Sequence, residues 1–403
     1  MTALAQVVAV DQDEFAATYW GRRPLLSRAA DLGGPDGFAA LLSADGVDEL
    51  LSRRGLRTPF LRVAQHGKVL PATRYTGSGG AGAEIADQVH DEQVMRLYAG
   101  GATLVLQGLH RLWPPIVDLA DRLGAQLRRP LQVNAYLTPP ASQGFATHYD
   151  THDVFVLQAE GEKRWCVHPP VLPDPLEQQP WGGHADEVAA TAEGEPALDV
   201  VLHPGDALYL PRGWLHSARS QTSRSLHLTV GIRGLTRYAL VEELLLAAAA
   251  DPRLRAGLAY GTDLTDPETV ATELTATIDA LRAWLPTADP AMIAGRLRER
   301  TWSQTRPAPL RPLAQHDFAA GLTPLDEVAV RPGLRWTLER AGDQVILQLT
   351  GRHLRLPERC AAALRHALDG RVHRVGDLPL PDDADRLVLA RRLLTEGVLV
   401  PGG

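Results

Sequence analysis

The chain has 403 residues, more than one ordinary domain holds, so we expect two or three domains. Hydrophobic residues make up 45% of the sequence, which is enough to bury sizeable cores. The formal net charge of -7 argues against a general nucleic-acid or membrane binder, although a basic substrate stays open because local charge matters more than the sum.

The sequence contains two cysteines, Cys166 and Cys360, far apart along the chain. This excludes a disulfide framework and suits a reducing compartment. The first residues, MTALAQVVAVDQDEF, lack the basic segment of a signal peptide, and the most apolar run, residues 244–250, is too short to span a bilayer. We therefore expect a cytoplasmic protein with no membrane segment.

Residues 1–130 mix helical and extended patterns. The segment DQDEFAATYWGRRPLL at 11–26 predicts a short capped helix followed by a proline stop. GSGGAGAE at 77–84 predicts a loop, and IVDLADRLGAQL at 116–127 repeats apolar residues at helical spacing.

Residues 131–235 favour short strands rich in β-branched and aromatic residues, separated by Gly and Pro turns. The expected strands are LQVNAYL (131–137), DVFVLQA (153–159), KRWCVH (163–168), DALYL (206–210) and SLHLTVGI (225–232). Many short strands with such turns indicate an antiparallel sandwich or barrel, and a cupin-type jelly roll fits them.

Residues 236–300 predict helices, at 237–258 and 266–285. The second opens with Asp266-Pro267, an N-cap followed by proline at the first helical position. Residues 306–312, RPAPLRP, predict a linker.

The C-terminal region resembles a winged helix in the order of its elements. Its expected helices are 356–370 and 384–397, and its expected strands are 334–340, 344–350 and 397–401. The fold class predicted for the whole chain is mixed α+β. A jelly-roll domain (1–235) is followed by a helical region (236–305) and a winged-helix domain (306–403).

One candidate metal site stands out. His148 and Asp150 are separated by one residue, and on a strand such residues point to the same face. The segment HPGDALYLPRGWLHSA adds a strand and two turns that present His216. Two histidines and one carboxylate form the facial triad of non-haem Fe(II) oxygenases. Four further histidines near the motif are expected to be surface or satisfied core residues: His152, His168, His184 and His203.

These motifs carry a family resemblance. NAYLTPPASQGFATHYDTHDVFVLQAEGEKRWCVHPP, PGDALYLPRGWLHSA and SLHLTVGI resemble segments of the JmjC-type ribosomal oxygenases, 2-oxoglutarate-dependent hydroxylases of ribosomal proteins. YWGRRPLL and LVLQGLHRLWPP also look like family segments. In that family a helical dimerisation region and a winged-helix domain follow the jelly roll, so the resemblance also implies a homodimer.

The resemblance implies a role for each matching residue. His148, Asp150 and His216 fall at the iron-ligand positions. Lys163 falls where the family has a basic residue that binds the distal carboxylate of 2-oxoglutarate. Asn134 matches a polar position near this co-substrate, and His227 lies where a polar side chain commonly borders the same pocket. The implied cofactors are Fe(II), 2-oxoglutarate and O2.

Lys163 is one of only two lysines, the other being Lys68, in a chain whose default cation is arginine. A compact ammonium can serve as a point-charge anchor in a narrow barrel. The alternative is that Lys163 is exposed beside Glu160 and Glu162. The alternation of 163–168 leaves open which face is interior.

The function implied is hydroxylation of a ribosomal protein at a histidine or arginine. An acidic enzyme suits a basic ribosomal segment. Two alternatives stay open: a hydroxylase of a small molecule or peptide natural product, and a non-enzymatic DNA-binding sensor. The second is disfavoured because residues 306–403 hold 14 Arg against 12 acidic residues, with no basic recognition face.

Overall fold

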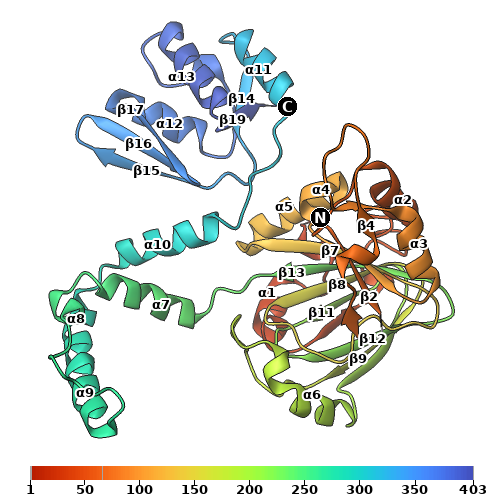
Figure 1. Cartoon of the computed structure of the whole chain (residues 1–403). Coiled ribbons are helices and arrows are strands. Elements are labelled where there is room, and N and C mark those ends of the chain that lie inside the picture. The colour runs from red at the N-terminus through yellow and green to blue at the C-terminus, as the bar shows by residue number, and fades with distance from the viewer. Residues whose placement is uncertain (1, 66, 403) are drawn as a thin grey trace. The chain divides into compact units, whose positions relative to one another are not determined.

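The computed structural model describes residues 2–65 and 67–402. The chain divides into two compact units, Met1–Gly234 and Leu235–Gly403 (Figure 1). Each unit is described by itself.

The first unit is built around an eight-stranded antiparallel sheet. Its strands in spatial order are β1 (Leu25–Ser27), β11 (Ala207–Leu210), β8 (Asp153–Glu160), β13 (Ser225–Ile232), β7 (Leu131–Thr138), β6 (Thr103–Leu106), β2 (Leu61–Gln65) and β3 (Lys68–Val69). The five strands expected from the sequence are all present, within a few residues of their predicted ends.

A second sheet faces the first and closes the jelly roll. Its strands in order are β10 (Leu198–Leu202), β9 (Lys163–His168) and β12 (Leu215–Ser220). Trp165 and Val167 of β9 pack in one apolar cluster with Val154 and Val156 of β8, which joins the two sheets. The predicted cupin-like β-sheet core is therefore confirmed.

β8 is buried on both faces, which explains its nearly continuous apolar sequence. Val154 and Val156 face the second sheet, whereas Phe155 and Leu157 face the other way, into the larger core that the N-terminal elements complete. This larger core contains the predicted helix at 116–127, which is α5 (Pro114–Leu127).

Short helices surround this core. They are α1 (Gln12–Glu14), α2 (Ala44–Arg53), α3 (Asp91–Ala99) and α4 (Leu109–Leu112), with 3-10 turns at Leu4–Gln6, Ala29–Asp31 and Ala72–Arg74. A 3-10 turn at Trp181–His184 leads into α6 (Ala185–Ala192), whose Val188 packs in a separate small cluster with Tyr149 and Leu215. β4 (Thr76–Gly77) and β5 (Gln88–Val89) form a two-stranded ribbon. The predicted capped helix near residue 11 is present: the Asp11 carboxylate accepts hydrogen bonds from the backbone N–H of Asp13 and Glu14, and α1 continues into a π-helical turn, Phe15–Tyr19.

The second unit begins with four helices, α7 (Arg237–Ala248), α8 (Pro252–Arg255), α9 (Pro267–Trp284) and α10 (Pro290–Trp302). The predicted cap of α9 is confirmed, because the Asp266 carboxylate accepts a hydrogen bond of 3.0 Å from the backbone N–H of Thr269. Asp289 and Pro290 open α10 in the same way, a repeat of the signal that the sequence reading did not use.

The rest of the second unit contains two three-stranded sheets and three helices. The elements are α11 (Pro312–Ala320), β14 (Glu327–Val330), β15 (Trp336–Ala341), β16 (Gln344–Leu349), β17 (Arg352–Pro357), α12 (Ala361–Ala367), β18 (Val372–Arg374), α13 (Asp383–Thr395) and β19 (Leu399–Pro401). The sheets run β15-β16-β17 and β18-β14-β19. The two predicted helices and three predicted strands are present, whereas α11, β14, β17 and β18 were not anticipated. Among the described residues, no helix is long and apolar enough to cross a membrane.

Candidate metal centre

A cavity of about 450 Å³ lies between the two sheets of the jelly roll. Side chains of β7 that point inward line one wall, namely Gln132, Asn134 and Tyr136, and His227 and Thr229 of β13 lie beside them. The opposite wall comes from the second sheet and from the segment before β8. The cavity therefore collects residues from distant parts of the sequence.

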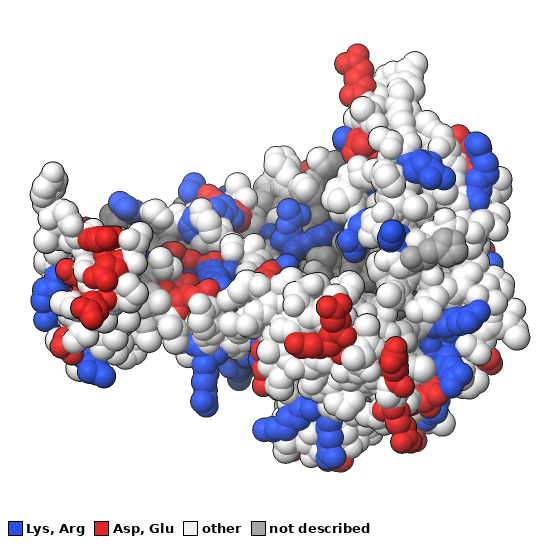
Figure 2. Space-filling view, turned by 60° about the horizontal axis from the view of Figure 1, so that its bottom comes forward, with Lys and Arg blue, Asp and Glu red and all other residues white. Residues whose placement is uncertain are grey.

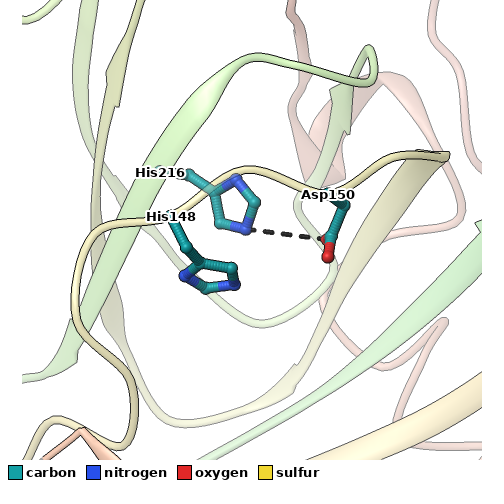
Figure 3. Close-up of side chains that lie close together, drawn as sticks. All are labelled: His148, Asp150 and His216. Atoms are coloured by element: carbon teal, nitrogen blue, oxygen red, sulfur yellow. Dashed lines mark ion pairs between the residues drawn. The ribbon is translucent and has the colours of Figure 1, made fainter. Parts of the chain in front are cut away.

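The predicted triad converges in this cavity (Figure 3). One ligand atom each from His148, Asp150 and His216 can be chosen so that all three lie within 4.8 Å of one another. The Nε2 atom of His216 is 3.8 Å from Oδ2 of Asp150, and the two imidazole centroids are 4.5 Å apart.

The strand expected at the His-x-Asp pair is reduced to one bridge. His148 pairs with His216 through two backbone hydrogen bonds of 2.8 and 3.2 Å, but the residues around His148 do not continue the ladder. The backbone N–H of Gly213 donates a hydrogen bond to the carbonyl oxygen of Asp150, and this bond fixes the backbone at the end of the segment. His216 itself is the second residue of β12, a strand that the sequence reading treated as the end of a turn.

Both histidines are oriented by backbone carbonyls two residues earlier in the chain. Nδ1 of His148 lies 2.8 Å from the Ala146 carbonyl oxygen, and Nδ1 of His216 lies 3.1 Å from that of Trp214. A carbonyl can only accept, so each Nδ1 carries the hydrogen and each Nε2 keeps its lone pair for a metal.

The charge states suit a divalent cation. Burial, and then the neighbouring His148, lower the pKa of His216 to about 4, so its imidazole is neutral near pH 7. Burial tends to raise the pKa of Asp150, but His152, His216 and His148 outweigh it and hold that pKa below its usual value. Two imidazoles and one carboxylate are the donor set of a 2-His-1-carboxylate iron site, so the residues present fit this metal.

Lys163 lies inside the barrel, with 4% of its surface exposed. Its Nζ donates a hydrogen bond of 3.0 Å to Oγ1 of Thr138, which in turn lies 3.2 Å from Oγ1 of Thr103. Burial lowers the pKa of Lys163 to about 7, and no acidic side chain among the described residues offsets this. The open question of the β9 face is settled: Lys163, Trp165 and Val167 point inward.

A buried ammonium without a counter-charge is unfavourable, so this end of the cavity fits an anionic ligand. The register of the second sheet places Lys163 opposite Ser220 and places Val167 opposite His216. Lys163 and the triad therefore lie along one wall, separated by the layer of Trp165 and Ala218.

Asn134 and His227 also line the cavity. The Oδ1 atom of Asn134 accepts a 3.2 Å hydrogen bond from the backbone N–H of Gly108. His227 stacks on Tyr136 with ring centroids 4.9 Å apart, and its buried Nδ1 has no hydrogen-bond partner among the described residues. Burial, and then the charge of Lys163, lower the pKa of His227 well below its usual value.

The expectation for His152 holds only in part: it lies outside the metal cluster, as expected of a residue that is not a ligand. It lines the cavity rather than lying on the surface or in the core, because it continues the alternation of His148 and Asp150 by two more residues. That alternation was the signal that could have found it. The expectation holds for His184 and His203, which lie at the surface beside Glu187 and Glu162. His168 is a core residue as expected, but its buried Nδ1 has no hydrogen-bond partner among the described residues, so it is not a satisfied one.

The part of the chain that forms this cavity is similar to a known family. A family model described as the JmjC domain matches residues 111–240, which hold all six predicted site residues. Residues 111–240 are therefore similar to a JmjC domain. The curated relatives include ribosomal oxygenase 1 of Gallus gallus, 33% identical over 253 residues, and the bifunctional lysine-specific demethylase and histidyl-hydroxylase NO66 of Drosophila persimilis, 30% identical over 245 residues. The predicted resemblance to JmjC-type ribosomal oxygenases is thereby confirmed.

The extent of the similarity differs between these comparisons. The matches cover 62% and 60% of this chain but only 39% and 33% of the two relatives, so the chain spans well under half of their length. YcfD, a ribosomal oxygenase from Escherichia coli, has a similar fold along nearly the whole chain. The comparison of the two structures gives a TM-score of 0.53 at 18% sequence identity, and it covers 98% of this chain and 99% of YcfD. A structure of YcfD in complex with cobalt and 2-oxoglutarate matches equally well.

Proposed function

We propose that this protein is an Fe(II)- and 2-oxoglutarate-dependent oxygenase that hydroxylates a side chain of a ribosomal protein. The observation that carries the proposal is one cavity that holds both a 2-His-1-carboxylate cluster and a buried lysine without a counter-ion. Relatives named ribosomal oxygenase and histidyl-hydroxylase support the reaction class and the substrate class.

Each residue has a defined task in this proposal. His148, Asp150 and His216 hold the iron, and the two backbone carbonyls keep the imidazoles in the ligating tautomer. Lys163, with Thr138 beside it, binds the distal carboxylate of 2-oxoglutarate. Asn134 and His227 border the space between these two ends and leave Nδ2 and Nδ1, respectively, for the co-substrate.

The apolar and aromatic layer of the cavity, including Trp165 and Tyr136, limits the access of water. When bound, Fe(II), 2-oxoglutarate and O2 together supply the oxidising chemistry that places one oxygen atom in a C–H bond of the substrate, with succinate and CO2 as the other products. The remaining work of the chain is to position the target carbon.

The affinity for 2-oxoglutarate is expected to fall as the pH rises above 7. Lys163 is charged below its pKa of about 7 in the ligand-free cavity and is neutral above it, and only the charged form pairs with a carboxylate. The dissociation constant should therefore rise by up to about tenfold for each pH unit above this value. Calorimetry on the manganese-substituted protein between pH 6.5 and 8.5 measures this.

The control for this pH series is Lys163→Arg, because a guanidinium stays charged throughout the range. Its dissociation constant should vary much less with pH. An equal slope in the wild type and in this variant would assign the titration to another group.

Histidine is the favoured target residue. Among the described residues that line the cavity, Asp150 is the only acidic one, and it belongs to the metal cluster. A guanidinium would therefore meet no free carboxylate there, and it would meet the positive charge of Arg62, another lining residue. A neutral imidazole avoids both penalties.

The second candidate, hydroxylation of a small molecule or peptide natural product, would use the same iron site. Incubating the iron-loaded protein with 2-oxoglutarate and ribosomal proteins of the source organism separates the two. The proposed function predicts succinate release coupled to the gain of one oxygen atom by a ribosomal protein. Succinate release only with small peptides or metabolites would favour the alternative.

We also propose that residues 236–305 form a homodimer interface. α7 and α9 each expose an apolar stripe at helical spacing, Tyr238, Val241 and Leu245 on α7 and Val270, Leu274 and Ile278 on α9. Leu245 of α7 and Leu274 of α9 are each 54% exposed, which is unusual for an apolar side chain in the middle of such a stripe unless a partner covers it.

The full-length protein is expected to be a dimer at micromolar concentration, as measured by light scattering. Leu245→Glu combined with Leu274→Glu should make it a monomer, because the two charges would be buried without partners. Val388→Glu, at an exposed apolar position on α13, is the matched control and should stay dimeric. A monomeric wild type would refute the interface.

The C-terminal residues 306–403 are proposed to be a winged-helix domain that contacts protein rather than DNA. Residues 306–403 hold 14 Arg against 12 acidic residues, and Figure 2 shows basic and acidic side chains interspersed on the face of the protein that it draws. The two cysteines are both free thiols, which supports a reducing, cytoplasmic location.

A further inference from the structure

A third inward-pointing residue follows the two metal ligands of the His148 segment. His148, Asp150 and His152 alternate along an extended stretch, and all three line the cavity. His152 is not part of the metal cluster itself.

The side chain of His152 packs against Gln132 and Gly231. Its Nε2 lies 3.4 Å from Nε2 of Gln132, and the ring rests against Gly231. A Cβ at Gly231 would come within 2.7 Å of Nε2 of His152 and within 3.0 Å of Cγ of Gln132, so only glycine leaves room for both side chains. Gln132 and Gly231 face each other across the β7–β13 ladder.

The register places this pair beyond the metal cluster as seen from Lys163. Along β7, Thr138 contacts Lys163, Tyr136 lies opposite His227, Asn134 lies opposite Thr229, and Gln132 comes last. The co-substrate occupies the Lys163 side of the cluster in the proposed function. The Gln132–His152 pair therefore faces the part of the cavity that remains for the substrate side chain.

The hydrogen-bonding pattern of this region is fixed. The amide of Gln132 donates to Nε2 of His152, so His152 presents Nδ1–H and Gln132 presents its Oε1 as a free acceptor. Nearby, Nδ1 of His110 accepts from the backbone N–H of Val133, and burial lowers the pKa of His110 to about 4, so it presents Nε2–H. A neutral imidazole has one donor and one acceptor and can satisfy such a set.

We propose that Gln132 and His152, seated on Gly231, form the subsite that selects the target side chain by hydrogen bonding to a neutral imidazole. This proposal rests on the proposed function and adds the residues that set its specificity. Gly231 acts as a positioning residue, because it touches the substrate only through the pair that it seats.

The test measures peptide binding to the full-length manganese-substituted protein with 2-oxoglutarate, without O2. The probes are 15-residue peptides that tile the ribosomal proteins of the source organism, and the tightest histidine-containing peptide is compared with its Arg-for-His version. The variants are Gln132→Leu, His152→Leu, their combination, and Gly231→Ala. Gln344→Leu, at an exposed position of the second unit, is the control.

Each single variant should raise the dissociation constant of the histidine peptide about tenfold, the loss expected for one buried neutral hydrogen bond. The dissociation constant of the Arg-for-His peptide should change little. The ratio of the two dissociation constants, which measures the preference for histidine, should therefore fall. The double variant should lose less than the sum of the two single effects, because the two side chains act as one unit. The affinity for 2-oxoglutarate should stay unchanged in all of them, which a general collapse of the cavity would not allow.

The outcomes separate this proposal from the function on which it rests. Equal losses for both peptides, or no loss in Gln132→Leu and Gly231→Ala, would overturn the subsite while the wild type still bound and modified its peptide. A wild-type protein that binds none of the peptides would overturn the protein-hydroxylase function and the subsite together.

Discussion

Replacing Asp150 with alanine is expected to abolish metal binding and, with it, the turnover of 2-oxoglutarate. Asp150 is the only anionic donor of the cluster, and an imidazole contributes no charge when it binds a metal. His148→Ala and His216→Ala should have the same effect, because each leaves two donors for an ion that the site holds with three. The three side chains line a cavity, so their loss should leave the fold largely intact.

Anaerobic calorimetry with Fe(II) or Mn(II), followed by an assay for succinate, measures both parts of this prediction. His203→Ala is the matched control, since this imidazole is exposed and pairs with Glu162 at the surface. It should bind metal and release succinate as the wild type does. A variant that lacks one of the three ligands and still releases succinate at the wild-type rate would remove that residue from the metal site.

The second large effect is expected at Lys163. Lys163→Ala should leave the metal bound and weaken 2-oxoglutarate strongly, because in the proposed function this buried ammonium pairs with the distal carboxylate. Such a loss costs about 2–5 kcal/mol. This corresponds to roughly a 30-fold to several-thousand-fold rise in the dissociation constant. Calorimetry on the manganese-substituted protein measures it.

Two further substitutions serve as comparisons for Lys163→Ala. Lys163→Arg should do less harm if the end of the cavity near Thr138 admits the wider guanidinium. Lys68→Ala should change nothing, because Lys68 is exposed on the short strand β3, as its sequence context predicts. Equal affinities for the wild type and Lys163→Ala would mean that another residue holds the distal carboxylate.

Elements with a strong local signal could be predicted from the sequence. β8 and β9 have apolar, β-branched residues between Gly turns, and α9 has an Asp-Pro start, so each lies near its expected position. α11 and β17 were missed because their residues are mostly polar or exposed, and tertiary pairing decides their structure. β12, which carries His216, was missed for the same reason: only its pairing with β9 makes LHSARS a strand.

Only those parts of the site that depend on residue types and their spacing could be predicted from the sequence. The triad followed from a His-x-Asp pair and a later histidine, whereas the inward direction of Lys163 depends on which face of β9 meets β8. The carbonyls of Ala146 and Trp214 that fix the tautomers have no sequence signature, because any residue has a carbonyl. His152 was discounted since its seat, Gly231, lies 79 positions further along the chain and meets it only in the fold.

The most direct test of the central claim is mass spectrometry of the ribosomal proteins in cells of the source organism that lack this protein. We predict that one ribosomal protein is lighter by one oxygen atom than in wild-type cells, at a histidine. Wild-type protein supplied in trans should restore the mass, and the Asp150→Ala variant should not. Identical masses of all ribosomal proteins with and without the protein would contradict the assignment.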